Sequence, residues 1–338
     1  MNLILIHAFV ERFPVIHQTM KKIRVDFCDF GPNWNKTDSF LYRLLAERFD
    51  LELCDHPDFL IYCRSCYQVH KLHSCVRICY SGESDLPDMR QCDYSLAPVQ
   101  FDHPRHLQFP HYLQVWNPAE VVKKNDDPEK ILAGKTKFCS FIVSGYNKRK
   151  NGNRVEFFRK LSQYKPVDSG GRKFNNIGGP IAGGSPGKIE FLRAYKFNIA
   201  FENRSLAGHA TEKIIEPMVA RCLPIYWGDP TIKEQFNQRS FLNRSDFPSD
   251  EALIEKIIEL DQNDAKYLAY LREPYFQQDT PNKYFDHNRT LDFFEKIFTQ
   301  KITPVAQAGR KRFSFGRIFG RWKLVKRNHW HPVQPPTW

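Results

Sequence analysis

The sequence predicts an α/β protein made of two facing Rossmann-like domains. A length of 338 residues exceeds the size at which a single hydrophobic core stops growing, so two domains are expected. In the first half, short apolar runs are separated by turn residues, and in the second half apolar runs alternate with segments of helical spacing. Such alternation is typical of parallel sheets covered by helices. Two sheets of this kind would leave a cleft between them.

The first half contributes five expected strands and one helix. Residues 39–48 have helical spacing through Phe40, Leu44 and Leu45, with Asp38 before them as the expected N-cap. The five strands are the apolar runs at residues 23–27, 49–53, 59–63, 76–80 and 94–97.

The polar stretch at residues 121–130 suits an exposed crossing between the domains. We therefore expect a first domain at residues 1–130, a second at 131–300, and a separate C-terminal tail at 301–338.

The second half alternates more clearly. Its glycine-rich stretch 183–187 follows no phosphate-binding fingerprint and is expected to be a connecting loop. Helices near the C-terminus are expected to cross back toward the first domain. The expected strands are 138–143, 197–201 and 223–227, and the expected helices are 154–164, 188–195, 211–220 and 250–261.

Charge is concentrated at the C-terminal end. The net charge is +12, but residues 296–338 hold ten Lys or Arg and no Asp or Glu, which leaves +2 for the remainder. A nucleic-acid binder should spread its basic residues over one face of a folded domain, so this distribution argues against that class.

No apolar run approaches the ~20 residues of a membrane span. The apolar residues 3–6 are too few for a signal peptide, and Glu11 and Arg12 follow soon after. Nine cysteines, an odd number in a chain that needs no disulfides, indicate a reducing cytoplasm.

A polar constellation follows the expected strand 197–201. Glu202 and Asn203 end that strand, a turn of small residues comes next, and Thr211-Glu212-Lys213 opens a helix. Ligands bind at the carboxyl ends of parallel strands, and free N–H groups at a helix N-terminus favour an anion. Lys213 adds a positive charge there, and Glu212 can accept hydrogen bonds from ribose hydroxyls. A sugar diphosphate fits these groups, and so does the alternative of an ordinary capped helix with a solvated Glu–Lys pair.

Several blocks in this region, in order and spacing, resemble the signature of the α-1,3/α-1,4-fucosyltransferase family, of bacterial type. The three main blocks are YKFNIAFEN at 195–203, TEKI at 211–214 and LPIYWG at 223–228, and VDSGG at 167–171, SFL at 240–242 and DF at 246–247 extend the match. The resemblance covers residues 137–280 well and the preceding part less well. It implies the GT-B fold and an enzyme that depends on GDP-fucose.

The resemblance also assigns roles to residues of both halves. Gly82-Glu83 is similar to a strand-end Gly-Glu whose carboxylate acts as general base in an inverting transfer. Gly82 would let the chain turn sharply and leave Glu83 at the sheet edge. Lys213 and Arg172 would neutralise the departing GDP, with Lys173 as a competing cation. Donor-binding residues would be Glu202, Asn203, His209, Glu212, Lys213 and Arg172. His209 stands where the family commonly has a tyrosine.

The implied reaction moves L-fucose from GDP-fucose to the 3- or 4-hydroxyl of N-acetylglucosamine in lactosamine-type glycans, such as Lewis antigens on a surface lipopolysaccharide. No cofactor or metal site is expected, although stimulation by a divalent cation is compatible with it. Two alternatives stay open: another nucleotide sugar on the same scaffold, and a non-enzymatic adaptor that binds membranes or nucleic acid.

Four cysteines offer a competing zinc site. Cys63, Cys66, Cys75 and Cys79, with two histidines between them, could supply soft ligands. Cys79 belongs to an apolar strand, however, and the spacing from Cys75 to Cys79 is unlike a zinc knuckle. Free buried thiols are the favoured interpretation, and zinc is not excluded.

The tail alternates basic and aromatic residues. At helical spacing Phe315, Ile318, Phe319 and Trp322 share one face, and cations occupy the rest. This pattern predicts that residues 310–330 lie on an anionic membrane. The expected location is therefore the inner face of the cytoplasmic membrane, with a nucleic-acid arm and a merely solubilising tail as alternatives.

Overall fold

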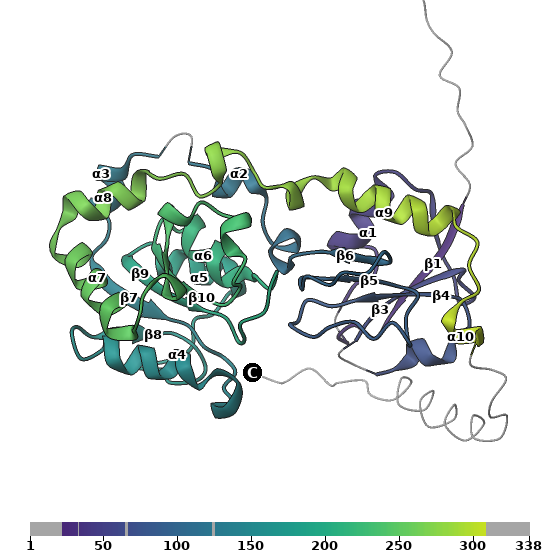
Figure 1. The fold of residues 1–338 in the computed structure, drawn as a ribbon, viewed down its shortest axis with the longest axis horizontal. Helices are drawn as coiled ribbons and strands as arrows, with labels where there is room; N and C mark the ends of the chain where they lie inside the picture. The colour runs from purple at the N-terminus through teal and green to yellow at the C-terminus, as the bar shows by residue number, and fades with distance from the viewer. Residues whose placement is uncertain (1–21, 33, 65–66, 124–125, 309–338) are drawn as a thin grey trace, which may run out of the picture.

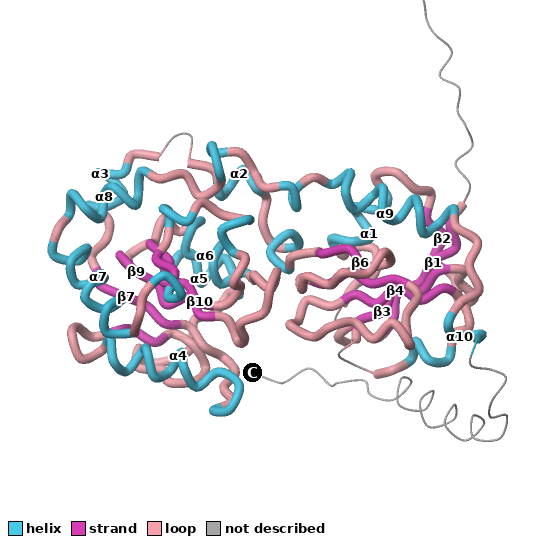
Figure 2. The backbone as a smooth tube through the Cα atoms, viewed as in Figure 1, coloured by secondary structure: helices cyan, strands magenta, loops and turns pink. Residues whose placement is uncertain are grey.

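The structure is a computed structural model that describes residues 22–32, 34–64, 67–123 and 126–308, with the backbone alone at 148–152. It has two lobes, each with a parallel sheet at its centre and helices around it (Figures 1 and 2). The predicted fold class is therefore confirmed. Residues 3–6, which are expected to be too few for a signal peptide, and residues 310–330, which are predicted to lie on a membrane, fall outside the described residues.

The first sheet has the strand order β2-β1-β3-β4-β5-β6, and all its pairings are parallel. All residues of its central strands β4 and β5 are buried, as expected where a parallel sheet is covered on both faces. The strands are β1 (Ile23–Cys28), β2 (Leu51–Leu53), β3 (Phe59–Cys63), β4 (Val76–Tyr80), β5 (Tyr94–Ala97) and β6 (His106–Gln108).

The second sheet has the order β11-β10-β9-β7-β8 and is also parallel. Its central strand β9 pairs with β7 on one side and β10 on the other, so residues 202 and 203 emerge at the middle of the carboxyl edge. The strands are β7 (Lys137–Phe141), β8 (Val167–Ser169), β9 (Tyr195–Phe201), β10 (Leu223–Trp227) and β11 (Leu242–Asn243).

Ten α-helices are assigned within the described residues. They are α1 (Phe40–Ala46), α2 (Pro118–Val121), α3 (Pro128–Ala133), α4 (Lys148–Leu161), α5 (Gly184–Leu192), α6 (Glu212–Val219), α7 (Asp250–Gln262), α8 (Asp264–Arg272), α9 (His287–Thr299) and α10 (Val305–Ala308). Short 3-10 turns connect several of them; the one that concerns the site, η2, spans His111–Gln114.

Three local predictions are corrected. Ser39, not Asp38, caps α1, and its Oγ accepts a hydrogen bond from the N–H of Tyr42 at 3.2 Å. The stretch 121–130 is not a plain crossing, because α2 ends and α3 begins within it. The expected loop 183–187 forms the first turn of α5, where a Cβ on Gly187 would lie 1.9 Å from the carbonyl oxygen of Ala182. Glycine is needed there for close packing and not for mobility.

The chain crosses between the lobes twice, as expected for its C-terminal helices. After α8 it returns to the first lobe, where α9 lies beside α1 (Figure 1). The ring of Phe298 packs edge-on against Phe49 and Phe59, with centroids 5.0 and 4.8 Å away. Arg48 binds Asp292 at 2.5 Å. The first sheet is therefore covered by a helix from the far end of the described chain.

One apolar cluster extends across both lobes. Tyr112 in η2 is fully buried, and its hydroxyl donates to Oε1 of Gln235 in the second lobe at 2.8 Å. Its ring also contacts Phe236 and Phe285, each with a centroid distance of 5.5 Å. This packing joins the two lobes through buried side chains. In the described part of the chain, no helix has the length and apolarity needed to cross a membrane.

Candidate functional site

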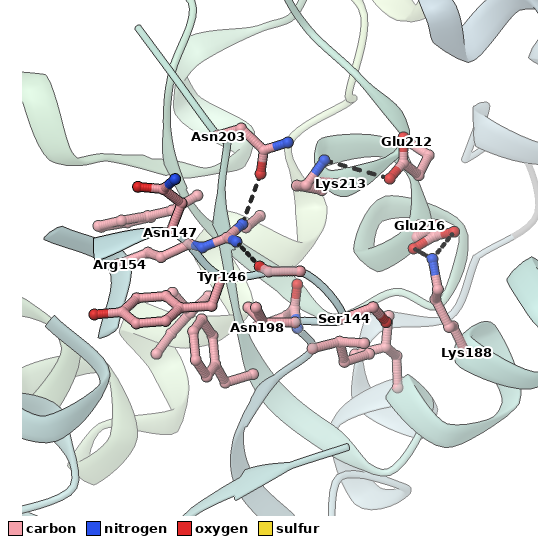
Figure 3. A pocket seen from close by; sticks show the side chains of 18 residues that line it. Ser144, Tyr146, Asn147, Arg154, Lys188, Asn198, Asn203, Glu212, Lys213 and Glu216 are labelled. Carbon is pink, nitrogen blue, oxygen red and sulfur yellow. Dashed lines mark hydrogen bonds and ion pairs between the residues drawn. The ribbon is translucent and has the colours of Figure 1, made fainter. Parts of the chain in front are cut away.

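A cavity of about 450 Å³ opens at the carboxyl edge of the second sheet (Figure 3). Its walls come from the ends of β7 and β9, the segment that follows β7, and helices α4, α5 and α6. The position agrees with the general rule for ligand sites in parallel sheets. The polar lining residues are Ser144, Tyr146, Asn147, Arg154, Lys188, Asn198, Asn203, Glu212, Lys213 and Glu216.

Lys213 lies between two carboxylates at the N-terminus of α6. Its Nζ is 3.1 Å from Oε2 of Glu202 and 3.3 Å from Oε1 of Glu212, and it also contacts the Thr211 hydroxyl at 2.9 Å. Thr211 caps the helix, since its Oγ1 accepts from the N–H of Lys213. Glu202 is fully buried and accepts from the backbone N–H of Thr211 at 2.8 Å. Glu202 therefore holds the helix start and Lys213 in place, while Glu212 and Lys213 line the cavity.

These contacts keep the pair ionised. Burial alone would lower the pKa of Lys213, but Glu202 and Glu212 outweigh it and hold that pKa above its ordinary value. Burial would likewise raise the pKa of Glu212, but the Lys213 ammonium and the His111 ring hold it well below its usual range. At neutral pH the cavity thus presents a fixed ammonium and a fixed carboxylate.

Arg154 lines the wall of the cavity opposite Lys213 and Glu212. The sequence patterns did not predict this residue. It reaches from α4 to donate a hydrogen bond to Oδ1 of Asn203 at 2.8 Å and another to the carbonyl of Gly145 (Figure 3). Only 3% of the residue is exposed, and burial lowers its pKa. Arg154 shares a helix face with the buried Phe157 and Leu161, so a cation on an apolar face was the signal that could have found it.

The formal charges around the cavity cancel among the described side chains. Lys188 of α5 binds Glu216 of α6 at 3.0 Å, a second pair that the sequence analysis missed. Lys188, Arg154 and Lys213 are the three cations around the cavity. Glu202, Glu212 and Glu216 supply three carboxylates. A ligand with two negative charges would therefore need a further cation or hydrogen-bond donors.

Glu83 lies on the first lobe, just beyond the end of β4. Its side chain is exposed, and its N–H donates to Oγ of Ser81 at 3.2 Å. The sequence-based reason for Gly82 is corrected: its φ is not in the left-handed region, and its small size is needed by a neighbour. A Cβ on Gly82 would lie 2.6 Å from Cδ2 of His111. Glycine here allows an imidazole to approach the turn that carries Glu83.

Three further predicted residues lie outside the cavity lining. His209 is 2% exposed, and burial lowers its pKa despite the nearby carboxylates of Glu202 and Glu83. Its Nδ1 is buried without a hydrogen-bond partner in the described structure. Arg172 and Lys173 are exposed in the loop after β8 and do not line the cavity. Their roles stay predictions.

The proposed zinc ligands are only partly described, since Cys66 lies outside the described residues. Cys79 is 2% exposed and packs with Tyr62 and Cys92 in a small buried cluster. Among the described residues, no group of three or more His, Cys, Asp or Glu side chains is placed to hold a metal ion.

Comparisons with known proteins match both halves of the chain to one family. Residues 132–291 match the family described as "Glycosyltransferase family 10 (fucosyltransferase) C-term", and residues 25–115 match "Alpha-(1,3)-fucosyltransferase FucT N-terminal domain". The chain is 28% identical to the α-(1,3)-fucosyltransferase FucT of Helicobacter pylori over 77% of its own length. It spans 62% of the length of that relative.

Solved structures show the same fold. A crystal structure of an α1,3-fucosyltransferase with GDP superposes with a TM-score of 0.69 at 26% identity, covering 85% of this chain and 93% of that one. Another, with GDP-fucose, gives 0.66 at 25% identity, covering 89% and 96%. These matches identify the two-lobed architecture as the GT-B fold. With family models matching in both lobes, the chain belongs to glycosyltransferase family 10, the fucosyltransferases.

Proposed function

We propose that this chain transfers L-fucose from GDP-fucose to the 3- or 4-hydroxyl of N-acetylglucosamine in lactosamine-type glycans, with inversion at the anomeric carbon. The observation that carries the proposal is the cavity at the carboxyl edge of the second sheet, where the ionised Lys213 and Glu212 meet the buried Arg154. The GDP and GDP-fucose complexes of the similar structures support a guanosine diphosphate sugar as the donor.

On the donor side, Lys213 and the N–H groups at the start of α6 would face the diphosphate. Glu212 would accept hydrogen bonds from the ribose hydroxyls, and Arg154 would hold Asn203 and the segment after β7 in shape. Because the formal charges around the cavity cancel, one more cation is needed as GDP departs. Arg172 is our candidate, with Lys173 as the alternative, because both lie exposed on the loop after β8.

On the acceptor side, Glu83 would act as general base. The acceptor hydroxyl would give its proton to Glu83 as its oxygen attacks the anomeric carbon, and the bond to the GDP oxygen would break. We assign residues 1–130 to the acceptor side and 131–300 to the donor side, apart from α9, which packs on the first lobe. The exposure of Glu83 at the carboxyl edge of the first sheet supports this role, because the acceptor must reach it from solvent.

The test is GDP release from GDP-fucose by the purified chain, with and without N-acetyllactosamine. Release that depends on the acceptor supports the proposed reaction, and the linkage in the product shows which hydroxyl was used. If another nucleotide sugar is turned over and GDP-fucose is not, the donor assignment fails. Adding EDTA and then Mg²⁺ or Mn²⁺ to the same assay measures any stimulation by a divalent cation.

Replacing Arg154 by Met should weaken both the fold and donor binding. The change leaves the Gly145 carbonyl and the Asn203 amide without their donor, which should lower the free energy of unfolding by about 1–3 kcal/mol. GDP affinity, measured by calorimetry, should fall about tenfold if Asn203 faces the nucleotide. Arg159→Met, on the exposed face of the same helix, is the matched control and should change neither quantity. GDP affinity equal to that of the control would remove Arg154 from the donor site.

The tail supports a further proposal about location. We propose that residues 310–330 attach the enzyme to anionic lipid at the inner face of the cytoplasmic membrane, where it would modify a surface lipopolysaccharide. Removal of residues 310–338 takes away eight of the ten cations in the segment 296–338. Sedimentation with vesicles of phosphatidylglycerol should then fall markedly, while GDP release in solution persists. Vesicle binding that equals that of the full chain would count against the proposal.

A further inference from the structure

His111 joins the two halves of the site. It is the first residue of η2, on the first lobe, and its Nδ1 lies 3.5 Å from Oε2 of Glu212 at the start of α6. Both side chains are partly shielded, with 33% and 24% of their surface exposed. The Nδ1 atom itself is buried and has no hydrogen-bond partner among the described residues. The imidazole therefore faces the carboxylate at the limit of hydrogen-bond distance.

The other edge of the same ring faces the turn that carries Glu83. A Cβ on Gly82 would lie 2.6 Å from Cδ2 and 3.3 Å from Nε2 of His111, so the ring occupies the space of a side chain at position 82. Gly82 directly precedes Glu83 in sequence. The His111 imidazole thus packs against the backbone beside Glu83 and faces the carboxylate of Glu212.

We infer that His111 is a positioning residue that ties the donor site to the general base. Its Nδ1 faces the Glu212 carboxylate at 3.5 Å, and its ring edge packs against the turn at Gly82 that carries Glu83. This inference rests on the proposed function, since Glu83 and Glu212 take their roles from it. His111 itself needs no contact with the substrate.

The arrangement gives donor binding a route to the base. Glu212 belongs to the second lobe, and Gly82 and His111 belong to the first. A small approach of the lobes when the donor enters would bring Nδ1 of His111 within hydrogen-bond distance of the Glu212 carboxylate. Catalytic hydrogen bonds often form fully only in the complex with substrate. The ring would then press the Gly82 turn and fix Glu83 against the acceptor hydroxyl.

The experiment is a double-mutant cycle between Gly82→Ala and His111→Ala, read by kcat and by GDP affinity. Gly82→Ala should displace the ring and lower kcat about 10- to 100-fold, because small misplacements of a reacting group are costly. His111→Ala should have an effect of similar size. GDP affinity should change less than about threefold in Gly82→Ala, because Lys213 and Glu212 are both kept. In the double variant the new methyl group fills the space that the ring has left. Adding Gly82→Ala to His111→Ala should therefore lower kcat by less than about twofold.

Two matched controls isolate the contact. Gly31→Ala adds a methyl group in open space on the same lobe, and His287→Ala removes another histidine that faces a glutamate, Glu47, at 3.3 Å. Neither should change kcat. His111→Asn, whose amide nitrogen can stand in for Nδ1, should recover part of the kcat lost in His111→Ala. His111→Leu, which fills the space without a hydrogen-bond donor, should not.

The inference is overturned if the Gly82→Ala penalty is the same with and without His111, or if His111→Ala leaves kcat unchanged. Failure of the proposed function is a separate result, because it appears as no GDP-fucose turnover by the wild type. In that event thermal unfolding of the same four proteins still tests the packing contact, and the cycle is repeated with whichever nucleotide sugar is turned over.

Discussion

Replacing Glu83 by Gln should lower kcat for fucosyl transfer by about 10²- to 10⁴-fold, the range for loss of a general base. The amide keeps the size of the side chain but cannot take the proton from the acceptor hydroxyl. GDP affinity should stay within about twofold, since the donor site lies on the other lobe and Glu83 is exposed. Rapid-quench assays of GDP release and calorimetry with GDP measure the two quantities separately.

The control for this variant is Asp85→Asn, a carboxylate two residues further along the same loop. Asp85 makes an exposed ion pair with Arg204 at 3.6 Å, and such pairs contribute little. Its kcat should therefore match the wild type. Full turnover by Glu83→Gln would show that another group accepts the proton.

Replacing Lys213 by Met should have the largest combined effect on stability and donor binding. It removes the ammonium that Glu202 and Glu212 share and leaves Glu202 as a buried, unpaired charge. The free energy of unfolding should fall by about 3–5 kcal/mol, as when one partner of a buried ion pair is deleted. Loss of a desolvated charge contact to the ligand should weaken GDP binding about 10²-fold or more.

A second substitution separates the two effects. In Lys213→Met combined with Glu202→Gln, the unpaired carboxylate is also removed, so denaturant titration should show that most of the lost stability returns. GDP affinity should stay low, because the cation is still missing. Lys137→Met, which removes an exposed lysine bound to Asp168 at 2.9 Å, serves as the lysine control. If the double variant binds GDP as the wild type does, Lys213 serves only to balance Glu202.

Local sequence patterns predicted the central strands well and the edge strands poorly. β3, β4 and β5 were expected at the residues where they occur, because strands covered on both faces read as continuous apolar runs. β6, β8 and β11 have only two or three residues each and include polar positions, so no apolar run marks them. Their pairing comes from neighbouring strands and not from their own composition.

Some residues of the candidate site could also be predicted from local sequence, and others could not. Asn203, Glu212 and Lys213 were found because they follow one strand and open the next helix, a local pattern. Arg154 lies 49 residues from its partner Asn203 in a sequence rich in cations, so its place on the apolar face of a helix is the local feature that distinguishes it. The contact of His111 with Gly82 and its approach to Glu212 also depend on tertiary packing. For this reason the sequence pattern predicted that Gly82 permits a sharp turn, whereas the structure shows that its lack of a side chain leaves room for the His111 ring.

The placement of α9 has a consequence for synthesis on the ribosome. The first sheet ends with β6 at Gln108, but the helix that covers it ends at Thr299, about 190 residues later. At translation rates of 5–20 residues per second, that interval lasts roughly 10–40 s. During it the nascent first sheet lacks the partner for Phe49 and Phe59 and exposes apolar surface to chaperones. The second sheet has all its strands and α7 by Gln262, so the later-made lobe should be the first to fold to completion.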